Sequence, residues 1–415
     1  MAIIRLRKKV KPIENLINYL FLYSISSIWI MIIINTVLVI AGIIYHKRYK
    51  LKDLDIEYPL VSIIVPAFNE EAVIEECVKS LRQLDYPNHE IIIVNDNSSD
   101  NTGSVLERYK AYIKVITTKG INANLGKSNA LNIALKHAHG DIISIYDADN
   151  TPSKDSLKYL VAELLSNDEY AAVTGKFTNR NKRYNLLTKF VELEASAFQL
   201  SNQGGMQILF KKSSIPGTNY VIWKDALLKA GKYDLDCLVE DTDLSLKLFQ
   251  MGYKIGFNPL AISYQESPAT IKNWFFQRLR WTKGNIYVTV KYLKQLSKCK
   301  NIIFDIIYLT GTYLIFLSSV IISDLIFTFL LFIDYQISLN INLVGFWLLA
   351  YILFIFQNAV VLLFEDEGVS NIFWVCLSYF SYSQLFIIVV VKSYVNYYFD
   401  WINQNEVRWY KTERF

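Results

Sequence analysis

Four charge-poor apolar runs constrain the fold of this 415-residue chain more than any other feature. They cover residues 16–45, 303–333, 342–364 and 371–391. Each matches or exceeds the roughly 20 residues that a helix needs to cross the hydrocarbon core of a bilayer. The first run is about twice as long as the apolar part of a cleaved signal peptide, so we expect a retained anchor. The sequence therefore predicts membrane helices on both sides of a polar middle region.

Charged residues and cysteines argue against several classes of protein. A formal net charge of +5 is too small to indicate a nucleic-acid-binding surface. Lysine and arginine flank the first apolar run almost equally on its two sides, so the positive-inside rule does not orient it. The four cysteines are scattered without a Cys-x-x-Cys pair, which argues against a disulfide framework or a zinc site.

Between residues 57 and 265, short apolar strands alternate with helices. We expect strands at 61–65, 90–94, 113–116 and 141–145, and helices at 72–84 and 127–138. Continuous apolar strands of this kind are typical of a parallel sheet that is covered on both faces, so we predict an α/β domain. Ligands of such sheets bind beyond the carboxyl ends of the strands, and Asp96 and Asp147 fall directly there.

Acidic residues at these strand ends predict a cation site. In Asp147-Ala-Asp149 a tight turn would bring two carboxylates toward one point. Carboxylates hold Mg²⁺ or Mn²⁺, and such an ion neutralises a diphosphate. Asp96 is a candidate acceptor for the imide N–H of uracil. Lys127 follows Gly126 at a predicted helix start and is a candidate diphosphate ligand, although a solvated surface lysine is the plainer interpretation of this residue alone.

Glu240-Asp241 opens a segment with helical spacing. A carboxylate at a helix N-terminus is often only a capping group. Alternatively, Asp241 is a general base that takes a proton from an attacking hydroxyl group. A displacement with inversion needs one such base and a stabilised leaving group, whereas a hydrolase needs a second carboxylate as acid or nucleophile.

Residues 270–298 predict an amphipathic helix or a pair of helices. Aromatic and basic side chains alternate just before an apolar run, which suits a helix in the membrane interface, and an ordinary core helix is the alternative. In Gln277-Arg-Leu-Arg280-Trp281, the side chains of Gln277, Arg280 and Trp281 share one helical face. Arg280 can grip a departing diphosphate, and Trp281 can stack on a pyranose ring.

These motifs resemble those of the processive family 2 glycosyltransferases. The resemblance is strongest to the poly-beta-1,6-N-acetylglucosamine synthase branch, and hyaluronan, chitin and cellulose synthases are more distant. It covers about residues 57–290. The matching motifs are Val65-Pro-Ala-Phe-Asn-Glu70, Asp85-Tyr-Pro87, residues 94–102, Gly126-Lys127, Asp147-Ala-Asp149, Glu240-Asp241 and Gln277-Arg-Leu-Arg-Trp281. Asn97 departs from the glycine that is usual in the family's Asp-Gly-Ser turn, but asparagine tolerates the left-handed conformation.

The resemblance implies a GT-A (Rossmann-like) domain inserted between transmembrane α-helices, a UDP-sugar donor, and Mg²⁺ or Mn²⁺ as cofactor. It also implies inversion to a β-linkage. Asp241 is then the catalytic base, and Asp149 holds the metal. The expected donor-binding residues are Asp96, Lys127, Asp147 and Arg280. The expected acceptor-binding residues are Gly217, Thr218, Glu240, Gln277 and Trp281.

From these features we divide the chain into four predicted parts. They are a basic segment with one transmembrane helix (1–56), a cytosolic GT-A domain (57–268), amphipathic interfacial helices (269–300), and transmembrane helices with a short tail (301–415). We expect a multi-pass enzyme of the cell membrane that polymerises N-acetylglucosamine from UDP-N-acetylglucosamine and exports the growing polysaccharide. A small membrane partner subunit would complete a channel that has few helices of its own.

Three other functions remain open from the sequence. The chain can be a hyaluronan- or glucan-type synthase with another UDP-sugar, or a non-processive transferase that adds one sugar to a lipid. The non-enzymatic alternative is a transporter or scaffold with a degenerate nucleotide-binding domain.

Membrane topology presents a conflict. If the catalytic domain is cytosolic, three later crossings place the C-terminal tail outside, although that tail carries Arg408, Lys411 and Arg414. In several synthases a similar Trp…Thr-x-Arg ending lies on the cytosolic side. Either one apolar run lies flat or re-enters the membrane, or the tail is external.

Overall fold

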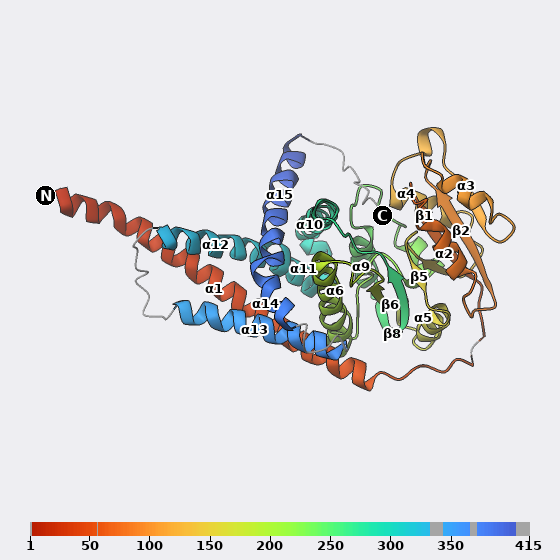
Figure 1. Cartoon of the computed structure of the whole chain (residues 1–415), viewed down its shortest axis with the longest axis horizontal. Coiled ribbons are helices and arrows are strands. Elements are labelled where there is room, and N and C mark those ends of the chain that lie inside the picture. The colour runs from red at the N-terminus through yellow and green to blue at the C-terminus, as the bar shows by residue number, and fades with distance from the viewer. Residues whose placement is uncertain (1, 56, 333–342, 366–371, 404–415) are drawn as a thin grey trace.

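The computed structural model describes residues 2–55, 57–332, 343–365 and 372–403. The predicted C-terminal Trp…Thr-x-Arg motif lies outside these residues. An α/β domain occupies one end of the molecule, and long helices extend from it at the other end (Figure 1).

One eight-stranded sheet forms the centre of the α/β domain, in the order β3-β2-β1-β4-β7-β6-β8-β5. The strands are Val61–Ala67 (β1), His89–Asn95 (β2), Lys114–Thr117 (β3), Ile142–Ile145 (β4), Thr151–Pro152 (β5), Tyr170–Asn179 (β6), Tyr220–Trp223 (β7) and Lys254–Gln265 (β8). The four strands expected from the sequence are β1 to β4, and they form a parallel half sheet.

The expectation of a parallel sheet is wrong for the other half. Strand β7 runs antiparallel to both β4 and β6, and β5 runs antiparallel to β8. Strand β7 follows directly on the loop at residues 213–219, most of which is buried. The sheet is therefore mixed, and only its N-terminal half is doubly wound.

Helices cover both faces of this sheet because its strands are apolar on both sides. Successive side chains of β1 point to opposite faces, so Ile63 and Ile64 join different hydrophobic clusters. The first cluster contains side chains of Ile74–Leu81 (α2) and Ser156–Leu165 (α5). The second contains side chains of Lys127–Leu135 (α4), Lys224–Lys229 (α8) and Glu240–Gln250 (α9). The short helix Thr102–Glu107 (α3) packs against α2.

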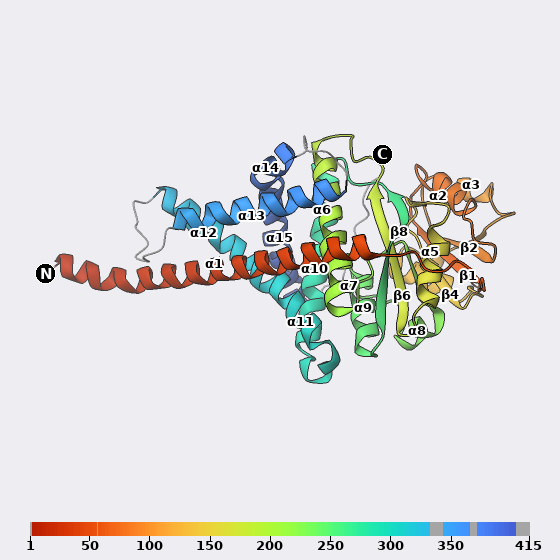
Figure 2. The ribbon, with the colours of Figure 1, turned by 90° about the horizontal axis from the view of Figure 1, so that it is seen from below.

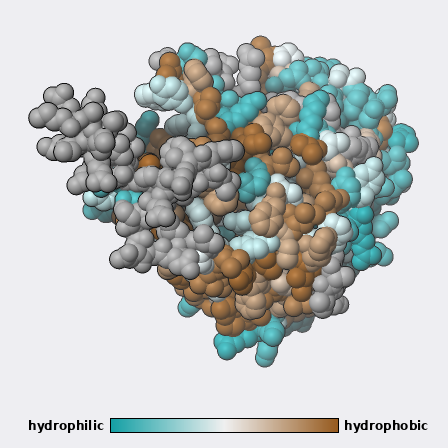
Figure 3. Space-filling model, turned by 60° about the vertical axis from the view of Figure 1, so that its left-hand side comes forward, coloured by the Kyte–Doolittle hydropathy of each residue, from teal (hydrophilic) through white to brown (hydrophobic). Residues whose placement is uncertain are grey.

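Within the described residues, four helical stretches are long and apolar enough to cross a membrane: Asn15–Arg48, Lys300–Thr328, Gly345–Phe364 and Ile372–Asn403. They coincide with the four predicted apolar runs. The helices are Ala2–Arg48 (α1), Ile303–Thr310 (α11), Leu317–Phe332 (α12), Leu343–Phe364 (α13), Ile372–Phe380 (α14) and Tyr382–Asn403 (α15), with a π-helical turn at Gly311–Phe316 (η5). Figure 3 shows apolar side chains gathered over this part of the surface.

The last apolar stretch differs in direction from the others. Helices α12 and α13 pack along α1 (Figures 1 and 2), whereas α15 lies across the direction of α1 (Figure 1). It packs against Ile271–Leu293 (α10). Helix α10 is the helix predicted within 270–298. It also contacts α9 and α11, so it lies between the α/β domain and the long helices.

A second connecting element joins β6 to β7. It consists of Leu186–Phe198 (α6), the π-helix Gln199–Gly205 (η2) and Met206–Phe210 (α7). The π-helix packs tightly on α1, since a β-carbon at Gly205 would lie 2.3 Å from the Leu38 main-chain oxygen. The α/β domain is thus held directly against the first membrane-type helix.

Candidate active site

A cavity of about 540 Å³ lies between the carboxyl ends of the parallel strands and helix α10. Every site residue expected from the sequence lines it: Asp96, Lys127, Asp147, Asp149, Gly217, Thr218, Glu240, Asp241, Gln277, Arg280 and Trp281. Residues that are up to 185 positions apart in the sequence, from Asp96 to Trp281, thus share one space. Their individual roles remain predictions.

Asp96 follows β2 directly and is buried. Its Oδ1 accepts hydrogen bonds from the Thr118 hydroxyl (2.7 Å) and the Asn124 main-chain N–H (2.9 Å). Its Oδ2 accepts from the Gly126 N–H at 3.2 Å. Asp96 therefore shapes the loop before α4, a contact that the sequence did not reveal. The next residue, Asn97, has φ 55°, which confirms the expected left-handed turn.

Lys127 begins α4 and is surrounded by oxygen atoms rather than by solvent. Its ammonium group lies 2.8 Å from Asp147 Oδ1 and 3.3 Å from Glu240 Oε1, and it donates to the Gly217 main-chain oxygen at 2.8 Å. Burial alone would lower the pKa of Lys127, but the charges of Asp147 and Glu240 outweigh burial and raise it. The plainer interpretation of Lys127 as a solvated surface residue is therefore wrong.

The Asp147–Asn150 turn follows β4 and is fixed by the side chain of Thr218. Its hydroxyl accepts a hydrogen bond from the Asp147 N–H at 3.0 Å and donates to Asn150 Oδ1 at 2.9 Å. Burial raises the pKa of Asp147, and the charge of Lys127 opposes that shift. Thr218 lines the cavity, but its hydroxyl group is already used to orient this turn.

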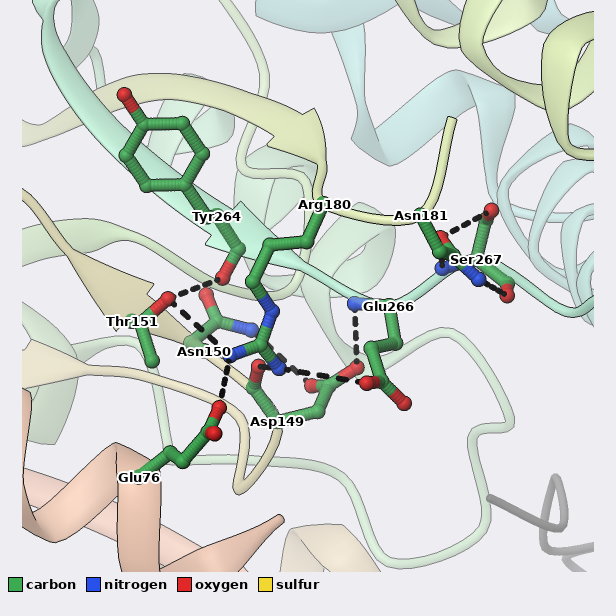
Figure 4. A network of polar contacts seen from close by, with 9 residues as sticks. All are labelled: Glu76, Asp149, Asn150, Thr151, Arg180, Asn181, Tyr264, Glu266 and Ser267. Atoms are coloured by element: carbon green, nitrogen blue, oxygen red, sulfur yellow. Dashed lines mark hydrogen bonds and ion pairs between the residues drawn. The ribbon is translucent and has the colours of Figure 1, made fainter. Parts of the chain in front are cut away.

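Asp149 points into a polar network in which a second carboxylate takes part (Figure 4). Its Oδ1 accepts from the Asn150 amide (3.1 Å), and its Oδ2 accepts from the Glu266 main-chain N–H (3.3 Å). Arg180 donates to the Asp149 main-chain oxygen at 3.1 Å and to Glu76 at 2.7 Å, and it lies 3.7 Å from Glu266. The Oε2 of Glu266 is buried without a hydrogen-bond partner among the described residues.

Glu240 and Asp241 form the first turn of α9, and both line the cavity. Asp241 Oδ1 accepts from the Thr242 N–H at 2.8 Å and so satisfies one free N–H of the first turn, although the N-cap residue is Val239 and makes no side-chain capping bond. A β-carbon at Gly217 would lie 2.9 Å from the other oxygen, Oδ2. Burial, with a smaller contribution from the charge of Glu240, raises the pKa of Asp241 to about 7. The hydrogen bond to Thr242 and a role as general base are compatible, because the hydrogen bond uses Oδ1 and leaves Oδ2 for the base.

Helix α10 brings Gln277, Arg280 and Trp281 to the cavity from one helical face. Arg280 donates to the Leu238 main-chain oxygen at 3.3 Å. The intervening residue Arg278 is buried and donates to Glu194 through Nε (3.2 Å) and Nη2 (2.9 Å). Its guanidinium carbon lies 4.3 Å from the centroid of the Trp281 ring, so the ring is supported from one side.

Sequence reasoning missed several residues of this cavity. Glu194 and Glu266 line the cavity, and Arg180 donates to the main-chain oxygen of Asp149, but none of the three belongs to a motif that was recognised. The cavity also continues to the long helices, where it is lined by Asn202, Lys212, Asp305, Tyr308 and Tyr313. One of these residues, Asp305, is an acid within the predicted apolar run 303–333.

Comparisons with known proteins agree with this geometry. Residues 62–225 match the family model described as "Glycosyl transferase family 2". "Probable glycosyltransferase YdaM" of Bacillus subtilis strain 168 is 40% identical over 412 residues, which cover 96% of this chain and 98% of that protein. "Poly-beta-1,6-N-acetyl-D-glucosamine synthase" of Staphylococcus epidermidis is 30% identical over 244 residues, which cover 58% of each chain.

Among solved structures, mannosyltransferase PcManGT from Pyrobaculum calidifontis, in complex with GDP-Man and Mn²⁺, superposes with a TM-score of 0.65. The superposition covers 92% of this chain and 99% of the other at 18% sequence identity. The two chains therefore share a fold over nearly their whole length.

Proposed function

This chain belongs to glycosyltransferase family 2, and on that premise we propose that it polymerises N-acetylglucosamine from UDP-N-acetylglucosamine at a membrane and exports the polymer. Membership makes the protein a glycosyltransferase with a GT-A fold. The donor, the processive inverting reaction and the export are the proposal. The relationship to poly-beta-1,6-N-acetyl-D-glucosamine synthases supports the choice of sugar.

The continuity of the cavity is the observation that carries this proposal. One space contains Asp96 at the strand ends, Asp241 at the start of α9, and Tyr313 in the π-helical turn before α12. A polymer that is extended at Asp241 therefore has a lined path toward the membrane-type helices. A scaffold with a degenerate nucleotide-binding domain would have no need for a complete acidic site joined to such a path.

The residues around Asp149 fit a divalent cation. The side-chain atoms near Asp149 that can ligate a cation include carboxylate and amide oxygens, which Mg²⁺ and Mn²⁺ prefer, and the Arg180 guanidinium lies beside them. No group of three or more His, Cys, Asp and Glu forms a complete cage within the described parts of the chain, so a donor diphosphate would complete the coordination. Asp149 would hold the ion, with Asp147 beside it. A bound ion would supply positive charge for the leaving diphosphate.

Asp241 performs the proton transfer in the proposed reaction. Its Oδ2 faces the cavity beside Gly217, where an acceptor hydroxyl can approach it. The acceptor oxygen attacks the anomeric carbon, its proton passes to Asp241, and the bond to the diphosphate oxygen breaks. With a pKa of about 7, Asp241 is ionised in a substantial fraction of molecules at neutral pH and is basic enough to take this proton.

Cationic side chains lie where the leaving group would depart. Arg280 and Lys127 both line the cavity and can donate to diphosphate oxygens. Trp281 offers one face of its ring to the acceptor sugar, while Arg278 supports the other face. The ion pair of Arg278 with Glu194 holds Arg278 in place beside the Trp281 ring.

We further propose that residues 57–268 form a cytosolic catalytic domain, because UDP-sugars are cytosolic. Residues 269–300 would form the interfacial helices, and residues 301–415 would form the C-terminal membrane part with its short tail. Helices α1, α11–α12 and α13 would cross the cell membrane. Helix α15 would lie in the interface, since it runs across α1 and carries Lys392 and Asp400. Three crossings then return the end of α15 to the cytosolic side, which reconciles the basic tail with a cytosolic domain.

UDP release by purified membranes tests the proposed reaction. Membranes with the chain should release UDP from UDP-N-acetylglucosamine, and EDTA should stop the release. Offering UDP-glucose and UDP-glucuronate separately distinguishes glucan- and hyaluronan-type synthases. Gel analysis of the product distinguishes a polymer from a single sugar on a lipid. Failure to turn over any UDP-sugar would contradict the proposal.

A further inference from the structure

The membrane end of the cavity contains an ion pair that the proposed transfer does not use. Asp305 lies in the first turn of α11, within the apolar stretch Lys300–Thr328. Charged residues within membrane-spanning segments usually face a bundle interior or a polar cavity and mark a substrate path. Asp305 and its partner Lys212 both line the cavity, together with Asn202 and Tyr308.

Asp305 has one carboxylate oxygen left for a ligand. Only 7% of the residue is exposed. Its Oδ1 accepts from the Lys212 ammonium at 2.5 Å, whereas its Oδ2 is buried with no hydrogen-bond partner in the described part of the chain. A buried acceptor without a partner is costly, and a donor group of a molecule in the cavity would relieve that cost.

Lys212 retains donors as well. Its ammonium lies 4.8 Å from the centroid of the Phe249 ring and 5.8 Å from that of Phe304, so two aromatic rings and one carboxylate hold it in place. An ammonium group has three N–H donors, and Asp305 takes one of them. Next to this pair, the Tyr308 hydroxyl donates to Asn202 Oδ1 at 2.6 Å. The wall of the cavity is therefore rich in hydroxyl, amide and charged groups at this point.

The ion pair and the proposed base lie at different positions along helix α9. Asp241, Ser245 and Phe249 occupy one face of α9, and all three line the cavity. The eight residues from Asp241 to Phe249 correspond to a helix rise of about 12 Å. Lys212 lies against the ring of Phe249, at the other end of this helical face from Asp241.

We propose that Lys212 and Asp305 form a glycan subsite that binds a sugar unit behind the one that receives the new unit. Lys212 donates to a hydroxyl or acetamido oxygen of that unit, and Asp305 Oδ2 accepts from one of its O–H or N–H groups. The inference rests on the proposed function, since it requires a glycan acceptor in the cavity. An ion pair in the wall favours a glycan over the hydrocarbon chain of a lipid, which offers it no hydrogen bonds.

Oligosaccharide binding by the full chain in detergent tests the subsite. N-acetylglucosamine and its pentasaccharide are the probes, and the variants are Asp305→Asn, Lys212→Met and the double variant. We expect the double variant to bind the pentasaccharide about tenfold more weakly or worse, as loss of charge-assisted hydrogen bonds predicts. Monosaccharide binding should weaken less than pentasaccharide binding, and polymer products should become shorter. Lys212→Arg keeps the ion pair and should retain pentasaccharide binding.

A second ion pair in the chain supplies a matched control. Lys176 of β6 and Glu365, just after α13, lie 2.5 Å apart, are largely buried, and also join the α/β domain to a membrane-type helix. Neither lines the cavity. The double variant Lys176→Met, Glu365→Gln should therefore leave pentasaccharide binding unchanged.

Two outcomes would overturn the subsite: equal weakening of pentasaccharide binding by both double variants, or no weakening by Lys212→Met with Asp305→Asn. The first would show that the pair only joins two parts of the fold. If the wild-type chain releases UDP normally in either case, the proposed function stands and this inference alone fails. Absence of UDP release from every donor would overturn both.

Discussion

The carboxylate of Asp241 lies against the bare backbone of Gly217, where a β-carbon would come within 2.9 Å of Oδ2. Gly217 also has φ 85°, a conformation that disfavours any side chain. We predict that Gly217→Ala displaces the base and lowers kcat for UDP release by about 100-fold, as expected for loss of much of a general-base contribution.

Gly231→Ala is the control for this prediction. Gly231 has a similar φ of 82°, but a β-carbon there would meet nothing within 4 Å. Its substitution adds the same backbone strain, roughly 1–2 kcal/mol, without touching the site. Equal losses of kcat in the two variants would show that strain, rather than contact with Asp241, causes the effect.

The protonation of Asp241 predicts how activity depends on pH. Burial and Glu240 raise the pKa of Asp241 to about 7, and only the ionised form can accept a proton. The kcat/KM for UDP release should therefore rise with pH through about 7 and reach a plateau above it. Asp241→Asn should lower kcat by about 100- to 10,000-fold. An activity that is flat between pH 6 and 8 would exclude Asp241 as the titrating base.

The two charged neighbours of Asp241 should shift this profile in opposite directions. The charge of Glu240 raises the pKa of Asp241, and the charge of Lys127 lowers it. Glu240→Gln should therefore move the midpoint of the profile to lower pH, whereas Lys127→Met should move it to higher pH. The midpoints are compared rather than the absolute rates, since both residues line the cavity. Shifts of the same sign would contradict the proposed electrostatics.

Metal binding should depend on Asp149. The residue is buried at the turn after β4 and shares a network with Glu266. Asp149→Asn replaces a charged ligand by a neutral one of the same shape, so we expect at least about tenfold weaker Mn²⁺ binding in the presence of UDP. Electron paramagnetic resonance of free Mn²⁺ measures this directly. Asp168→Asn, at an exposed position, is the control, and equal affinities in both variants would contradict the assignment.

Local patterns were sufficient to predict the donor end of the site. Asp96 and Asp147 each follow a continuous apolar strand, and parallel neighbouring strands end at the same edge of a sheet. The helical spacing of Gln277, Arg280 and Trp281 likewise places them on one face without knowledge of the fold. Both arguments use only the geometry of single elements and their order.

Contacts between distant segments could not be predicted in this way. Arg278 pairs with Glu194, which is 84 positions away, and nothing near Glu194 in the sequence identifies its partner. A lysine at a helix start is ordinarily solvated. The burial of Lys127 depends on three oxygen atoms, those of Asp147, Gly217 and Glu240, which come from segments far apart in the sequence. No strand was recognised between residues 146 and 265, where β5 to β8 lie, and the antiparallel strand β7 is one of these four.

The orientation of α15 predicts on which side of the membrane the C-terminus of the chain lies. Helix α15 runs across α1, and its Lys392 and Asp400 contact Phe275 and Lys283 of α10. Charged side chains are costly in the bilayer centre, so these contacts favour an interfacial helix. A fluorescent protein fused to the C-terminus should therefore be fluorescent in the cytosol, and alkaline phosphatase fused there should be inactive. Phosphatase inserted between α12 and α13 should instead be active, because the proposed three crossings put the connection between these helices on the opposite side. An active C-terminal phosphatase would show that α14 and α15 cross the membrane, and the proposed count of three crossings would then be wrong.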